Sequence, residues 1–230
     1  MGRSASAAAA PRKRPSTREQ ILDAAEELFS RYGLHDVMLR DVTGQVGVDH
    51  SLLHYYFKDK QELFDAVVAR RTPITCAKRM AALDAYEAQA DGNLTVEGIL
   101  RAYLDVERDL SGRDDNGYRY YGALAAQMSK VPECGTEIID AYFDPVALRV
   151  IDLLEQALPG CPREDVFWGY HFVAGALMVT MARADRVDRL SGGACDTQDV
   201  SAMKDRLAQF MAGGFLHVCA ARAGQRGGTA

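Results

Sequence analysis

One short stretch of the chain, residues 49–57, concentrates side chains that could bind nucleic acid. If it is helical, Leu53 points inward and four hydrogen-bonding side chains remain outward, namely His50, Ser51, His54 and Tyr55. Donors and acceptors on an exposed helix face can read base edges in the major groove of DNA. The chemistry indicated is therefore recognition by hydrogen bonding.

Residues 39–47 supply a second element that could hold this stretch in position. Val42 and Val46 lie four apart, as on one face of a short helix, and Gly47 then permits a sharp turn. Asp49 can cap the next helix by accepting a backbone N–H. Two short helices fixed at an angle form a helix-turn-helix, whose second helix enters the major groove. From spacing alone, an ordinary helical hairpin inside a core is an equal alternative.

The rest of the chain also predicts helices, because no alternating strand pattern with hairpin turns occurs in it. Two possible capping boxes, Ser16-x-x-Glu19 and Thr17-x-x-Gln20, and apolar residues at helical spacing predict a helix over 17–32 that ends at Gly33. The further helices are expected over 60–88, 95–110, 118–130, 133–142, 145–158, 163–183 and 198–221. The fold class expected is all-α.

Residues 17–68 resemble the DNA-binding domain of TetR/AcrR-type transcriptional regulators. The matching text is TREQILDAAEELFSRYGLHDVMLRDVTGQVGVDHSLLHYYFKDKQELFDAVV. Its most specific parts are the run from Ile21 to Ala25 and the pattern L-x-x-Y-F-x-x-K-x-x-L from Leu53 to Leu63. The resemblance implies an N-terminal three-helix DNA-binding domain with a helix-turn-helix, followed by an α-helical ligand-binding and dimerisation domain. It also implies double-stranded operator DNA as a partner.

The resemblance further implies a role for each matching position. Residues at base-edge positions are His50, Ser51 and Tyr55, and those at phosphate positions are Thr17, Arg40, His54 and Lys60. Thr43 is expected to face outward from the helix that precedes the turn at Gly47, toward the DNA backbone. This chain departs from the family pattern in having His54 where tyrosine is common, and Met38 where a threonine usually caps the first helix.

Composition and the resemblance together predict four segments. These are a disordered basic arm over 1–15, a DNA-binding domain over 16–62, a ligand-binding and dimerisation domain over 63–223, and a flexible tail over 224–230. The net charge is −5, with 27 Lys and Arg against 32 Asp and Glu. Residues 1–70 are balanced, with 10 charged residues of each sign, so the whole net negative charge comes from residues 71–230. The two regions are therefore expected to have different roles.

The later helices are rich in aromatic residues that could line a small-molecule cavity. Those expected to bind a ligand are Tyr103, Tyr118, Tyr121, Leu124, Met128, Tyr142, Trp168, His171 and Phe172. Plain core packing is the alternative for each of them. Arg119 and Arg149 could hold an anionic head group or form surface ion pairs. A weaker resemblance to regulators of fatty-acid breakdown implies an acyl-type effector.

The last two long helices are expected to form a homodimer. The helix over 163–183 is apolar around most of its circumference, so it must be buried on more than one side. The residues expected at the dimer interface are Phe167, Tyr170, Leu177, Met181, Leu207, Phe210 and Met211. Two helices from each subunit would make a four-helix bundle with a two-fold axis.

Several function classes are not expected. No nucleophile elbow, zinc-protease, Walker or dinucleotide motif occurs, and His171 with Glu164 or Asp165 is a poor acid–base pair, so neither catalysis nor a cofactor is expected. Five cysteines without a C-x-x-C pair are expected to be reduced thiols and to bind no metal. Without a signal or spanning segment, a cytoplasmic location and no membrane partner are expected. The function expected is that of a repressor that binds a near-palindromic operator as a homodimer and is released by a small apolar or amphipathic effector. A helical carrier without DNA binding and a transcriptional activator are the alternatives.

Overall fold

Helices are the only regular secondary structure among the residues that the computed structural model describes, which are 15–111, 124, 138–181, 186–197 and 199–227. The elements are α1 (Thr17–Asp36), α2 (Leu39–Val46), α3 (His50–Tyr56), α4 (Lys60–Ala90), α5 (Val96–Ser111), a π-helical turn η1 (Ile139–Phe143), α8 (Asp144–Ala157), α9 (Arg163–Met181), α10 (Arg186–Leu190) and α11 (Val200–Gly227). The expected all-α class is confirmed. In these ranges no helix has the length and apolar character that crossing a bilayer requires.

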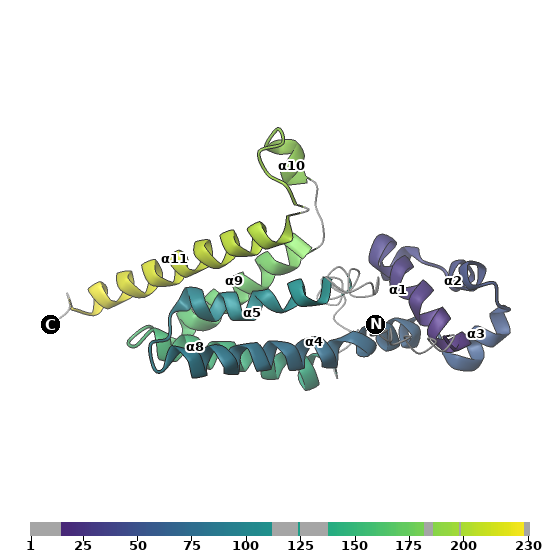
Figure 1. The fold of residues 1–230 in the computed structure, drawn as a ribbon, viewed down its shortest axis with the longest axis horizontal. Coiled ribbons are helices and arrows are strands. Elements are labelled where there is room, and N and C mark those ends of the chain that lie inside the picture. Colours follow the sequence, from purple (N-terminus) through teal and green to yellow (C-terminus); the bar gives the residue numbers. More distant parts are fainter. Residues whose placement is uncertain (1–14, 112–123, 125–137, 182–185, 198, 228–230) are drawn as a thin grey trace, which may run out of the picture.

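The helices form a small head and a longer body joined by α4 (Figure 1). The head contains α1, α2 and α3, and α4 leads from it along the body beside α5 and α8. On the other side of α5 lie α9 and α11, while α10 projects from the body. The 31 residues of α4 include Pro73, which does not end the helix.

The head is held together by its own apolar core. Ser16 caps α1 in a reciprocal capping box with Glu19, which fixes where the helix begins. Phe29 of α1 and Phe64 of α4 are fully buried and meet edge to face, with ring centroids 5.4 Å apart. Leu53 of α3 is also fully buried in this cluster. The core thus ties α3 to the long helix α4.

An ion-pair cluster adds a second link between α1 and α4. Glu26 of α1 is only 1% exposed and pairs with Arg70 and Arg71 of α4. Arg70 also reaches Asp23 at 2.6 Å. Burial raises the pKa of Glu26 more than the two guanidinium groups lower it.

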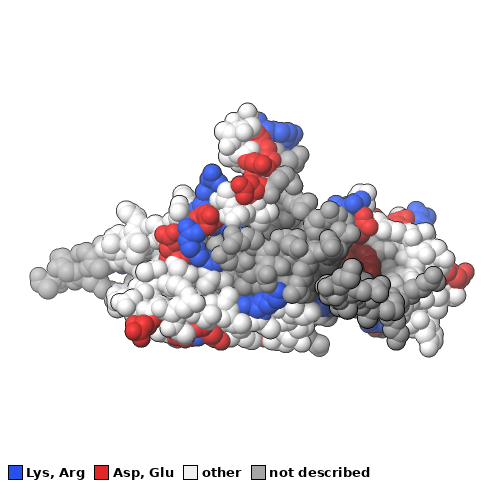
Figure 2. Space-filling model, viewed as in Figure 1, with Lys and Arg blue, Asp and Glu red and all other residues white. Residues whose placement is uncertain are grey.

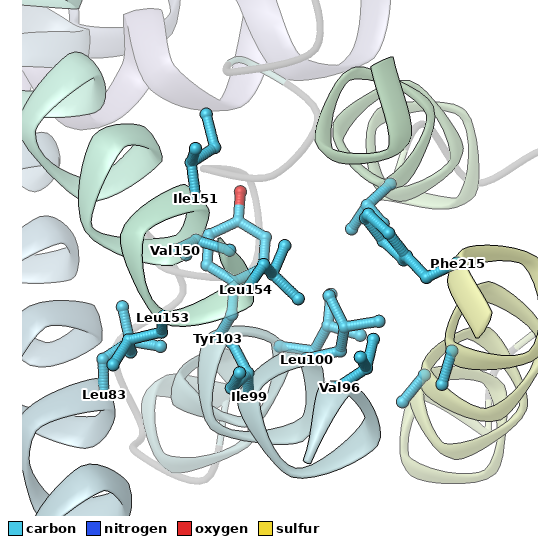
Figure 3. Packing of buried hydrophobic residues seen from close by; sticks show 14 of the residues in the cluster. Leu83, Val96, Ile99, Leu100, Tyr103, Val150, Ile151, Leu153, Leu154 and Phe215 are labelled. Atoms are coloured by element: carbon cyan, nitrogen blue, oxygen red, sulfur yellow. The ribbon is translucent and has the colours of Figure 1, made fainter. Parts of the chain in front are cut away.

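The body has a separate apolar core to which α4, α5, α8, α9 and α11 all contribute. Figure 3 shows Leu83 of α4, Leu100 of α5, Leu154 of α8 and Phe215 of α11 directed toward a common centre. Gly169 of α9 lies so close to Phe215 that an added Cβ would sit 2.2 Å from the ring. Glycine is therefore required where α9 and α11 approach each other.

The expectation that all cysteines are reduced thiols is wrong. Cys161, just before α9, forms a disulfide with Cys219 of α11, 58 residues away. Packing of α9 against α11 brings the two together, which their distance along the chain does not reveal. Cys76 is a buried free thiol and Cys195 an exposed one, while Cys134 lies outside the described residues.

Candidate nucleic-acid interface and body core

The turn between α2 and α3 is built by local hydrogen bonds. Gly47 adopts φ 76° and ψ 34°, a left-handed conformation that favours glycine. Its N–H and that of Val48 both donate to the carbonyl of Thr43, at 2.9 and 3.1 Å. Asp49 then begins α3 by accepting the Ser51 N–H at 2.8 Å. The turn at Gly47 and the cap at Asp49 are those that the sequence predicted.

Helix α3 has one buried side and one exposed side. Leu53 is fully buried, and Phe57, directly after the helix, is 2% exposed. The four outward candidates are all exposed, namely His50, Ser51, His54 and Tyr55. Tyr55, at 80% exposed, is among the most exposed large side chains of the head. An exposed aromatic and three polar neighbours on one short helix form a surface able to contact base edges.

Ser51 presents an oriented hydroxyl on this surface. Its Oγ donates to Asp49 Oδ1 at 2.6 Å, so the proton points back toward the helix start. The oxygen lone pairs therefore face outward and can accept from a base amino group. The two hydrogen bonds from Ser51 lower the pKa of Asp49, which keeps this acceptor ionised.

His50 and His54 contact each other across one turn of α3. Their Nε2 atoms are 3.2 Å apart, and the ring planes are nearly perpendicular at 87°. His54 Nδ1 lies 3.2 Å from the carbonyl of Lys58. Because a carbonyl can only accept, Nδ1 of His54 carries the proton and its Nε2 accepts from Nε2–H of His50.

The four remaining DNA-contact candidates lie in different environments. Arg40 is exposed, and Thr17 in the first turn of α1 is half-buried. The ammonium of Lys60 donates to the carbonyls of His35 and Val37, both at 3.1 Å, and so closes the end of α1. The expectation that Thr43 faces outward is wrong. It is 7% exposed, and its hydroxyl donates to the carbonyl of Arg40, because α2 packs that side onto the head.

The body core contains a buried polar group that the sequence analysis missed. Arg79 of α4 is 6% exposed, and its guanidinium lies 5.2 Å from the ring centroid of Tyr103 on α5. The ring of Tyr170 on α9 is 6.2 Å from that of Tyr103. Burial, with Tyr103 close by, raises the pKa of Tyr170, so its phenol stays protonated. The signal was a charged residue in an apolar helical stripe, between Cys76 and Leu83.

Three aromatic residues of α9 that were expected to bind a ligand lie on the surface of the body. Trp168, His171 and Phe172 are exposed, and the rings of Trp168 and Phe172 stack with centroids 6.0 Å apart. Tyr170 and Leu177, expected at a dimer interface, instead pack in the body core. Successive residues of an α-helix are rotated by about 100°. Positions 166, 170, 173 and 177 therefore share the side of α9 that faces the core, and positions 168, 172, 175 and 179 share the exposed side.

The other ligand candidates do not gather around Tyr103 either. Leu124 is fully buried, but in the core of the head. Tyr142 in η1 is 38% exposed. Arg149 forms ion pairs with Asp84 and Glu87 of α4, at 2.9 and 2.6 Å, so it is a structural link between α4 and α8. The candidates that fall outside the described residues are Arg119, Tyr118, Tyr121 and Met128.

Several large apolar side chains are exposed along α9 and α11, and we call this set the outer face. Its members are Phe167, Trp168, Phe172, Val179, Phe210, Leu216 and Val218. Leu207 and Met211 lie half-buried beside it, while the side chain of Met181 is outside the described residues. A groove of about 160 Å³ between the two helices is lined by Trp168, Phe172 and Phe215. Large exposed apolar areas of this kind mark interaction sites.

A larger cavity, of about 630 Å³, opens where α9 ends and α11 begins. Apolar side chains of Val179, Val187, Leu190 and Met203 line most of it, with Arg206 at its polar side. Charged residues of both signs lie close together on the visible described surface in Figure 2. The described part of that face therefore has no large area of one sign.

Comparison with protein families gives two matches along the chain. Residues 21–67 match bacterial regulatory proteins of the tetR family. Residues 101–214 match the tetracyclin repressor-like C-terminal domain. The first match covers the turn and α3, and the second covers much of the body.

Curated relatives are transcriptional regulators. BetI of Klebsiella pneumoniae is 32% identical over 79 residues, which is 34% of this chain and 39% of BetI. The transcriptional activator FasR of Mycolicibacterium smegmatis is 28% identical over 138 residues, 58% of this chain and 60% of FasR. The matched stretches thus span less than two thirds of either relative.

Solved structures share the fold over most of the chain. A TetR-family regulator of Streptomyces coelicolor is 19% identical with a TM-score of 0.56, covering 86% of this chain and 95% of that one. A regulator of Saccharomonospora viridis in complex with choline has a TM-score of 0.56 at 15% identity, covering 84% and 94%. The fatty acid degradation regulator FadR of Bacillus halodurans has a TM-score of 0.52 at 15% identity, covering 87% and 96%.

Proposed function

The chain belongs to the TetR family of bacterial transcriptional regulators, and from that premise we propose that it is a homodimeric repressor released from its operator by a small effector. The observation that carries the proposal is the outward face of α3, where His50, Ser51, His54 and Tyr55 are exposed together. A two-fold dimer would present two such faces, so the operator would be a near-palindrome with half-sites about one helical turn apart.

Replacing Tyr55 by alanine is expected to lower operator affinity more than affinity for random DNA. Tyr55 is exposed on the same side of α3 as the polar candidates, so the change removes a base contact without opening the core. The loss expected at the operator is about 1–3 kcal/mol per half-site, or tenfold or more in binding constant. Footprinting on DNA upstream of the coding region identifies the operator, and gel shifts measure both affinities.

Arg40→Ala is the matched control for that experiment. Arg40 is exposed and is expected to contact a phosphate, so its loss should weaken binding to operator and to random DNA alike. It should also reduce the slope of log affinity against log salt by about 1 per site. Equal losses on both DNAs for Tyr55→Ala would remove that residue from base recognition. The absence of any protected two-fold site would favour the helical carrier without DNA binding.

For the dimer interface we propose the outer face, with Phe167, Phe210 and Met211 among its contacts. Tyr170 and Leu177 are left out because they pack in the core of their own subunit. The support for this proposal is the exposed apolar area on α9 and α11, which a second copy could cover isologously.

Phe210→Asp is expected to shift the protein from dimer to monomer. Phe210 is 77% exposed, so a carboxylate there is tolerated in one subunit, but a dimer would bury two of them. The dimer dissociation constant should rise roughly hundredfold, measured by sedimentation velocity. Leu148→Asp is the control, since Leu148 is also an exposed large apolar residue but lies on α8. If both variants stay dimeric, the interface lies elsewhere.

For the effector we propose a small amphipathic compound that binds in the body. The support is the cluster of Arg79, Tyr103 and Tyr170, which gives polar groups to an otherwise apolar core. The two structural relatives point to different compounds, since one regulates fatty acid degradation and the other binds choline. A buried guanidinium favours an anionic group, so an acyl-type carboxylate fits this core better than a cation. Mass spectrometry of ligand retained through purification tests this.

The direction of regulation is the remaining part of the proposal. FasR is an activator, so the same fold serves that function in a relative. A reporter gene placed behind the footprinted operator distinguishes the two directions. Repression predicts that deleting the regulator raises expression and that effector has the same result, whereas activation predicts a fall on deletion.

A further inference from the structure

We propose that His50 and His54 form a chelating site for a divalent transition-metal ion such as Zn²⁺ on the exposed face of α3. The juxtaposition that carries the proposal is the close approach of two imidazole Nε2 atoms, 3.2 Å apart on exposed side chains one helical turn apart. We call these two residues the histidine pair. The proposed function does not assign them any role with metals.

The separation of the two nitrogens fits a shared ion. In a tetrahedral zinc site each Zn–N distance is about 2.0–2.1 Å, which puts two ligand nitrogens about 3.3 Å from each other. The observed 3.2 Å lies within the tolerance of such a site. Rotation of both exposed rings about their side-chain bonds would aim the two Nε2 lone pairs at one point, and nothing in the buried core need move.

His54 already has the arrangement of a metal ligand. Its Nδ1–H donates to the carbonyl of Lys58, which fixes the tautomer and leaves Nε2 unprotonated, with its lone pair toward His50. Metal-ligating histidines almost always donate their other ring nitrogen to such a partner. His50 would move its ring proton from Nε2 to Nδ1 through solvent, so both rings bind as neutral ligands and no net proton is released.

The ion would keep open positions. Among the described residues no group of three or more His, Cys, Asp or Glu forms a metal cage, so the histidine pair supplies two ligands and water the rest. Borderline-soft ions that accept imidazole are favoured over Mg²⁺ or Ca²⁺, which prefer oxygen. The carboxylate of Asp49 precedes His50 in the chain and lies at the start of the same helix.

The consequence for DNA rests on the proposed function. A bound ion adds positive charge to the surface that we expect to face the major groove, and its water ligands can be replaced by the N7 acceptor of a purine. Zinc should therefore strengthen operator binding, and operator should strengthen zinc binding by the same factor.

The test uses the full chain labelled with ¹⁵N-histidine, in the Cys195→Ser background because the exposed Cys195 thiol is a competing zinc ligand. The chain has five histidines, so each ring can be followed during a ZnCl₂ titration. We expect the Nε2 signals of the histidine pair to move together with one ion per chain. The rings of His35, His171 and His217 serve as internal references.

His50→Ala and His54→Ala should each weaken zinc binding by about a hundredfold, because one imidazole loses the benefit of chelation. Because both rings are exposed, neither change should unfold the head, which the amide spectrum verifies. Movement of His171 or His217 in place of the histidine pair, or variants that bind zinc as the parent does, would overturn the site. These readouts need no DNA, so a failed gel shift with intact zinc binding would overturn the coupling to operator and leave the metal site standing.

Discussion

Replacing Cys161 by serine is expected to lower the free energy of unfolding by about 4 kcal/mol in non-reducing buffer. The disulfide closes a loop of 58 residues, and a cross-link of that length removes about this much conformational freedom from the unfolded chain. The loss should appear as a lower denaturant midpoint with a larger slope, because the uncross-linked chain exposes more surface when unfolded. Urea unfolding followed by circular dichroism at fixed protein concentration measures it.

Two controls isolate the cross-link from the serine itself. Cys219→Ser should match Cys161→Ser, and adding dithiothreitol should bring the parent to the same midpoint. Cys195→Ser should change nothing, since that thiol is free and exposed. If dithiothreitol leaves the midpoint of the parent unchanged while the variants still unfold at a lower midpoint, their loss of stability comes from packing around the sulfur atoms.

The place of this disulfide gives it a structural role beyond the loop it closes. It joins the start of α9 to α11, the two helices that carry the outer face. The nearby groove is lined by Cys219 together with Trp168 and Phe172. Fixing α9 against α11 thus fixes the shape of the surface that we propose for the dimer. The dimer and the cross-link should therefore be studied under the same redox conditions.

The head could be predicted from the sequence almost completely, because local rules determine it. Capping at Ser16, the turn at Gly47 and the inward Leu53 each follow from spacing within a few residues. The error at Thr43 has a local cause as well. Its hydroxyl bonds back to the carbonyl of Arg40, which lets a polar residue occupy a buried side of α2.

The body was harder to predict because its helices do not show which side is buried. Helix α9 is apolar around most of its circumference, so periodicity alone could not separate the core side with Tyr170 from the outer face with Trp168. The partner of Cys161 and the burial of Arg79 depend on contacts between distant helices. Spacing within one helix carries no information about such contacts.

The ion pairs of Glu26 depend on the same kind of long-range contact, and we expect their loss to cost about as much stability as loss of the disulfide. Glu26→Ala is expected to lower the free energy of unfolding by about 3–5 kcal/mol, because it leaves Arg71 and part of Arg70 without their buried counter-charge. Since α1 and α4 are joined there, the head should loosen first. Amide hydrogen exchange in α1 compared with α8 measures that order.

Glu26→Gln is the matched variant, since its amide oxygen can still accept hydrogen bonds from the arginines. Its free energy of unfolding should fall by less than that of Glu26→Ala. The two side chains also differ in pH dependence. Burial raises the pKa of Glu26 in the folded state, so its contribution is complete below the ordinary pKa of 4.5 and declines as pH rises through the folded value. The stability of the parent relative to Glu26→Gln should therefore fall as pH rises from 4.5. A difference that grows with pH would mean that the arginines, and not burial, control this carboxylate.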